Sequence, residues 1–166
     1  MNRTRQKTQR VALMGLMLSL MLILGFVESR LPVPGLPGVK LGLSNGVLLF
    51  ALYLLDVPSA LLLMVLKILL SGFLFGNPSS MMYAAAGGVV SLTGMILLSR
   101  TRQFSPVVVS MAGGLLHNVG QVGLAMIILQ TPGLLAYMAI LMLIGMVTGL
   151  ATGVAAKAVI EHFPKI

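Results

Sequence analysis

A cluster of hydrogen-bonding side chains interrupts an apolar run in the second half of the chain. It consists of His117, Asn118 and Gln121, in a segment otherwise typical of a membrane-spanning helix. Polar groups in hydrocarbon are costly unless a partner satisfies them, so polar residues at mid-span indicate a functional site. On a helix His117 and Gln121 share a face, with Gly113 one turn earlier. The expected chemistry is hydrogen bonding to a neighbouring helix or to a bound molecule.

The second unusual residue is Lys67, which lies near the centre of another apolar run. A lysine there costs about 2.5 to 3.5 kcal/mol on insertion scales, so it must pair, reach the interface or line a wet cavity. One interpretation is a structural ion pair with Glu28, one of only 3 acidic residues. The other is a contact with an anionic ligand. The sequence leaves both interpretations open.

Further polar residues stand near the ends of other apolar runs. Asn45, Asn77 and Tyr83 could complete a polar pocket, although each could equally cap or staple a helix. We predict that one set of side chains converges on a substrate-binding cavity near the outer half of the membrane. The set is Lys40, Asn45, Lys67, His117, Asn118 and Gln121.

Several kinds of chemistry lack the residues that they require. The chain has no cysteine, which excludes disulfides, thiolate metal sites and cysteine nucleophiles. His117 has no set of metal ligands around it, because the other histidine, His162, lies in the tail. Prenyl transfer of the usual kind needs clustered aspartates for Mg²⁺, and the chain has only Asp56. No nucleotide-binding loop is present either. We predict no enzymatic activity, no cofactor and no metal.

The composition identifies the class of protein. Hydrophobic residues make up 58% of the 166 residues and charged residues 8%, and the mean hydropathy is +1.05, which is far too apolar for a soluble domain. The formal charge of +8 lies mostly at the ends of apolar runs, where it sets membrane topology. No basic stripe alternates with aromatic residues, so nucleic-acid binding is not expected. We predict a single transmembrane domain over residues 1–166, embedded in a lipid bilayer.

Six apolar runs divide the chain, separated by breaks that carry proline, glycine or charge. The second run is the shortest and needs a tilt or an extension toward Lys40 to cross a bilayer. No long polar stretch marks a second domain. The predicted spans cover residues 11–27, 41–55, 58–75, 81–98, 106–129 and 134–156.

The lysines and arginines give the orientation. With the N-terminus inside, the outer segments hold only Arg30 and Lys40, as the positive-inside rule requires. The sequence therefore predicts an all-α integral membrane protein, a bundle of six transmembrane helices with both termini cytoplasmic. A basic head is expected at 1–10, a proline-rich external loop at 28–40 and a cytoplasmic tail at 157–166. The basic residues placed inside are Arg3, Arg5, Lys7, Arg10, Arg100, Arg102, Lys157 and Lys165.

Small residues recur along the first and last runs. Gly145, Gly149 and Gly153 are spaced by four, as are Gly15 and Ser19. Such spacing lets another helix backbone approach closely. Packing within the bundle is one interpretation, and docking of a partner subunit on the first helix is the other. The spacing alone does not separate them.

Two segments together resemble a known family. Their order and spacing, with the six-span plan, resemble the bacterial membrane family called Gx transporter or heptaprenyl diphosphate synthase component I, over nearly the whole chain. That family is similar to the S components of energy-coupling factor (ECF) transporters. The segments run from Glu28 through Pro32, Pro34, Gly38 and Lys40 to Asn45, and from His117 to Gln121.

The similarity to S components implies a substrate-binding subunit for uptake of a small molecule across the bacterial plasma membrane. Its partners would be a transmembrane T subunit, which meets small residues on the first helix, and two ATPases. The matching positions here are Ala12, Gly15 and Ser19, although Leu16 stands where a second alanine is usual.

The proline-rich segment 31–39 would form a lid over the substrate pocket. The other family name implies the alternative of a membrane helper for a separate polyprenyl diphosphate synthase. We favour transport over this role because of the resemblance and the buried polar groups. A third class, a purely structural membrane scaffold, would not need polar side chains at depth. A neutral or anionic compound with ring or amide groups fits the predicted pocket, and the sequence does not choose among such compounds.

Overall fold

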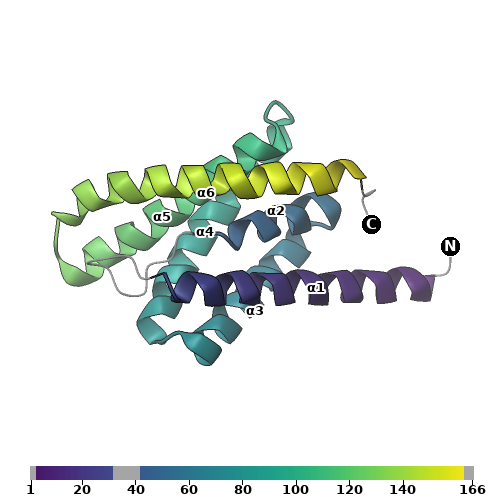
Figure 1. Cartoon of the computed structure of the whole chain (residues 1–166), viewed down its shortest axis with the longest axis horizontal. Coiled ribbons are helices and arrows are strands. Elements are labelled where there is room, and N and C mark those ends of the chain that lie inside the picture. The colour runs from purple at the N-terminus through teal and green to yellow at the C-terminus, as the bar shows by residue number, and fades with distance from the viewer. Residues whose placement is uncertain (1–2, 32–41, 163–166) are drawn as a thin grey trace.

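The computed structural model describes residues 3–31 and 42–162, and all regular structure there is helical (Figure 1). Five of the helices are long and apolar enough to cross a membrane. The chain is therefore a helical multi-pass membrane protein. In chain order the helices are α1 (Arg3–Ser29), α2 (Asn45–Leu54), α3 (Val57–Phe75), α4 (Pro78–Thr101), α5 (Pro106–Leu129) and α6 (Leu134–His162).

Each predicted span holds one of these helices, but α2 differs from the rest in length. It has 10 residues, which at about 1.5 Å per residue cover roughly half of a bilayer core about 30 Å thick. A full second span is therefore not observed. The basic residues predicted as a separate head form the first turns of α1, which begins at Arg3. The N-terminal end of α1 and the C-terminal end of α6 lie at the same end of the bundle (Figure 1), and the side of the membrane that they face stays a prediction.

Three helices begin where a side chain caps them. The side chains of Asp56, Asn77 and Ser105 each accept a hydrogen bond from the backbone N–H three residues on, at 2.8, 2.8 and 3.4 Å. A proline stands in the first two positions of each helix, where its missing N–H is not needed. These caps explain why α3, α4 and α5 start at the breaks that the sequence indicates.

The short helix α2 lies at the centre of the bundle. It contacts each of the other five helices, and its apolar side chains are buried on nearly every side, as expected for a helix that is hydrophobic all round. By contrast, within the described part of the chain α1 contacts only α2 and α3. Figure 1 shows α1 and α6 running separately, without lying against each other. The polar residues at the start of α2 are thus held in the interior.

Glycines bring α5 and α6 into close contact. A Cβ atom on Gly114 would lie 2.0 Å from the carbonyl oxygen of Gly145, and one on Gly149 would lie 2.6 Å from the carbonyl oxygen of Ser110. Gly153 likewise packs on Ser110. The glycine stripe of the last span therefore serves packing within the bundle, which was one of the two interpretations of its spacing.

Candidate ligand site

His117 stands halfway along α5 with 1% of its surface exposed. Two glycines make room for its imidazole ring. A Cβ atom on Gly42 would lie 3.2 Å from Cδ2 of the ring, and one on Gly87 of α4 would lie 2.9 Å from Cε1. Gly42 also has a φ of +86°, a backbone conformation that glycine adopts without strain. The segment before α2 and the middle of α4 thus enclose the ring from two directions.

Gln121 is hydrogen-bonded to His117 within α5, between Nε2 of the glutamine and Nε2 of the histidine. The expected shared face is present, and Gln121 is fully buried. A Cβ atom on Gly87 would lie 2.7 Å from Cγ of Gln121, so this face of α5 packs against α4. The carboxamide of Gln121 and the imidazole of His117 thus form one hydrogen-bonded pair inside the bundle.

Asn45, the first residue of α2, lies beside this pair. Its Nδ2 is 3.0 Å from the position that a Cβ atom on Gly42 would take, the same position that lies next to the His117 ring. The carboxamide of Asn45 and the imidazole of His117 are therefore close neighbours, although they are far apart in the sequence. Because His117 is halfway along α5, α2 begins at depth in the bundle.

Ser44 precedes α2 at the position of a helix cap, but its hydroxyl makes no cap hydrogen bond. The first backbone N–H groups of α2 are satisfied by tight turns instead. The N–H of Asn45 donates to Gly42 at 2.9 Å, and the N–H of Val47 donates to Ser44 at 3.1 Å. The backbone N–H groups at the start of α2 are thus hydrogen-bonded. Any unsatisfied polar group there belongs to a side chain.

Those side chains are buried and lack hydrogen-bond partners among the described residues. They are the hydroxyl of Ser44 and both amide atoms of Asn45, in residues that are 0% and 4% exposed. Leaving a buried polar group unsatisfied costs about 1 to 3 kcal/mol. We refer to Gly42, Ser44, Asn45, His117 and Gln121 as the α2-start site.

Asn118 points toward α6 instead. Its Nδ2 donates to the carbonyl oxygen of Leu141 in α6 at 2.7 Å, and a Cβ atom on Gly145 would lie 2.3 Å from the same nitrogen. Its Oδ1 is buried with no hydrogen-bond partner in residues 3–31 and 42–162. Asn118 thus ties α5 to α6 and leaves one acceptor unused.

Glu28 lies at the C-terminal end of α1, near the same site. It is 2% exposed, and its Oε1 accepts a hydrogen bond from the backbone N–H of Leu43, just before Ser44. A carboxylate therefore lies next to the α2-start site.

The remaining predicted site residues have different outcomes. Lys40 and the proposed lid at 31–39 fall almost wholly outside the described residues. Lys67 is buried in α3, with 3% exposed, and its pairing with Glu28 or with a ligand stays a prediction. Asn77 caps α4. Of the two roles considered for it, a helix cap or a member of the polar pocket, the structure shows the cap.

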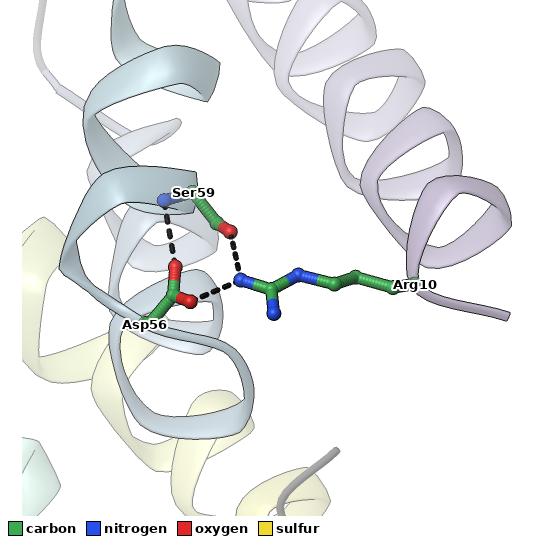
Figure 2. Close-up of polar contacts among 3 residues, drawn as sticks. All are labelled: Arg10, Asp56 and Ser59. Carbon is green, nitrogen blue, oxygen red and sulfur yellow. Dashed lines mark hydrogen bonds and ion pairs between the residues drawn. The ribbon is translucent and has the colours of Figure 1, made fainter. Parts of the chain in front are cut away.

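A second polar contact joins α1 to α3 near the predicted inner end of the bundle (Figure 2). Arg10 forms an ion pair with Asp56 and donates to Oγ of Ser59 at 2.8 Å. Hydrogen bonds from Ser59 and then from Arg10 lower the pKa of Asp56 from 3.8 to about 2. This contact fastens α1 to the bundle at the end opposite Glu28.

The sequence interpretation missed two features that the structure brings together. Ser44 was part of the recognised segment but not of the predicted site. Its place directly before Asn45 was the available signal. The ion pair of Arg10 with Asp56 was not anticipated, because the two residues are 46 positions apart and nothing local links them.

The small residues predicted for partner docking lie on a free face of α1. Ala12, Gly15 and Ser19 are all exposed, and a Cβ atom on Gly15 would meet no atom within 4 Å. Packing inside the described bundle therefore does not account for this stripe, in contrast to the glycines of α6.

The fold and the site define a class: a multi-pass membrane protein with a polar group of side chains buried beside a half-length central helix. A sequence model of the family described as heptaprenyl diphosphate synthase component I matches residues 17–159. The chain belongs to this family, which confirms the resemblance. Component I is a non-catalytic component of the synthase, in line with the expectation that the chain is no enzyme. No curated protein and no solved structure matches the chain.

Proposed function

We propose that the chain is the membrane-embedded substrate-binding subunit of a bacterial uptake transporter, similar to the S components of ECF transporters. The observation that carries the proposal is the carboxamide of Asn45, buried in an apolar bundle with neither of its polar atoms hydrogen-bonded within the described residues. A small molecule bound there would supply the missing hydrogen bonds. Lys40 and Lys67 remain candidate members of the same site, whereas Asn118 faces α6.

The half-length helix supports this proposal. Short helices that begin inside the membrane are a recurring element of transporter binding sites, because their ends bring polar groups to depth while protein covers the backbone. Here α2 has 10 residues and starts beside His117. A purely structural bundle gains nothing from unsatisfied polar side chains in that place.

Uptake against a gradient needs a source of energy, and the chain carries no nucleotide-binding loop. We therefore propose that a T subunit and ATPase subunits complete the transporter. The exposed stripe of Ala12, Gly15 and Ser19 on α1 is the proposed docking face, since a second helix backbone could approach closely there.

Affinity purification from bacterial membranes in mild detergent tests both parts of the proposal. The full chain should retain a small molecule, detected by mass spectrometry after denaturation, together with a membrane subunit and ATPases. The variant Gly15→Leu should lose these subunits and keep its thermal stability.

The matched control is Gly123→Leu on α5, another glycine with no atom within 4 Å of an added Cβ. This variant should keep the subunits. Equal retention by both variants would remove the α1 stripe from the account.

The family description favours a second candidate, a membrane helper of a separate polyprenyl diphosphate synthase. Under this alternative the same purification would yield a soluble prenyltransferase. The recovery of that enzyme without a small molecule or ATPases would contradict the transporter proposal.

A further inference from the structure

We infer that the ligand of the α2-start site is an uncharged molecule that presents an amide or lactam edge to Asn45. This inference rests on the proposed function and names the class of substrate. It narrows the choice between neutral and anionic compounds that the sequence leaves open.

The first argument is the kind of groups that lack partners. Within the described residues, the site offers the hydroxyl of Ser44 and the carboxamide of Asn45, and both are uncharged. The first backbone N–H groups of α2 donate to backbone carbonyls, so the helix start has few donors left for an anion. These two groups are therefore suited to hydrogen bonding with an uncharged partner.

The second argument is the shape of the carboxamide. Nδ2 donates and Oδ1 accepts, side by side in one plane. An amide or lactam edge offers an acceptor and a donor at the same spacing, so it satisfies both atoms at once, in the way that asparagine reads an adenine edge. A carboxylate or phosphate has acceptors only. Such an anion would accept from Nδ2. Its second oxygen would face Oδ1 of Asn45, and these two acceptors could not form a hydrogen bond.

Saturation-transfer NMR on the full chain in lipid nanodiscs tests the inference. The probes are uracil and nicotinamide, which carry the amide edge, and nicotinate and inorganic pyrophosphate, which are anions. We expect the amide probes to bind the unaltered protein and the anions not to bind. Asn45→Leu should weaken the amide probes by about tenfold, because two hydrogen bonds of about 0.5 to 1.5 kcal/mol each are lost.

Two controls keep this test interpretable. Asn45→Ser is a second variant in case the leucine disturbs α2, and thermal unfolding shows whether each variant is folded. Ser91→Ala removes a buried hydroxyl that already has its partner within the bundle, since it donates to the carbonyl oxygen of Gly113 at 2.8 Å. It should leave probe binding unchanged.

The outcomes separate the inference from the proposed function. Binding of nicotinate or pyrophosphate that depends on Asn45 would overturn the inference and leave a substrate-binding subunit in place. If no probe binds but a small molecule is extracted from the purified protein, its structure decides: an amide or lactam edge supports the inference, and its absence overturns it. If neither is found, buried water satisfies Asn45, and both proposals fail.

Discussion

Two groups of buried polar side chains in this bundle differ in how their hydrogen bonds are used. Along α4, α5 and α6, the hydroxyl cluster (Ser91, Ser110 and Thr152) is closed. Ser91 donates to the carbonyl of Gly113, and Thr152 lies 3.2 Å from Ser110 while donating to its own helix. The α2-start site is open, because Ser44 and Asn45 lack such partners in the described residues.

The difference separates a structural role from a binding role. Helices in a membrane associate through small residues and interhelical hydrogen bonds, and the hydroxyl cluster with its glycines supplies both. In the α2-start site, the hydroxyl of Ser44 and the carboxamide of Asn45 form no hydrogen bond to another described residue. Changes in the first group should therefore act on stability, and changes in the second should act on ligand binding.

The largest effect is expected where the glycines hold α5 against α6. In Gly114→Ala the new Cβ would lie 2.0 Å from the carbonyl oxygen of Gly145, so the two backbones must move apart. We expect a loss of at least about 2 kcal/mol of stability, in the range of overpacked cores, measured by thermal or denaturant unfolding in detergent. Gly123→Ala is the control, because its Cβ meets nothing within 4 Å. Similar losses in both variants would mean that α5 and α6 are not packed as described.

A smaller effect is expected in the hydroxyl cluster itself. Ser110→Ala removes the contact with Thr152, which keeps its own bond to the carbonyl of Thr148 at 2.9 Å. The expected loss of stability is about 0.6 kcal/mol, the mean for interhelical hydrogen bonds in membranes. Ligand affinity should not change. A change in ligand affinity in this variant would contradict the purely structural role of the hydroxyl cluster.

The smallest effect is expected from acid at the Arg10 contact. The pKa of Asp56 is lowered to about 2 from 3.8, so its contribution to stability is present above pH 4 and is lost as the pH falls toward 2. The Asp56 side chain is 39% exposed, which limits the contribution to less than about 1 kcal/mol.

Asp56→Asn isolates this charge, because asparagine also caps a helix. The difference in unfolding temperature between this variant and the unaltered chain should shrink from pH 5 to pH 3. A difference that stays constant over this range would show that the ion pair adds nothing.

Much of the fold could be predicted from local sequence, because the helix ends are set by local chemistry. Prolines with Asp56, Asn77 and Ser105 mark the starts of α3, α4 and α5, and the spacing of polar residues places His117 and Gln121 on one face. The glycine spacing of α6 indicated close packing but not its partner. Local sequence patterns were sufficient to predict a feature wherever the residues that cause it lie within one or two helical turns of each other.

The candidate site could be predicted only in part, because its contacts join distant segments. The predicted set placed Asn45 with His117, but no local pattern shows how close they lie, since their proximity depends on the length and central position of α2. Ser44 has the residue type of a helix cap, and only the backbone turns around Gly42 leave its hydroxyl unused. Such features arise from tertiary packing.

The most direct test of the account is native mass spectrometry of the full chain, released from membranes with its own lipids, compared between Asn45→Leu and Ser110→Ala. The account predicts one small molecule bound to the unaltered chain and to Ser110→Ala, and a clearly lower occupancy on Asn45→Leu, while all three unfold at similar temperatures. The same small molecule on Asn45→Leu at equal occupancy, or none on the unaltered chain, would contradict it.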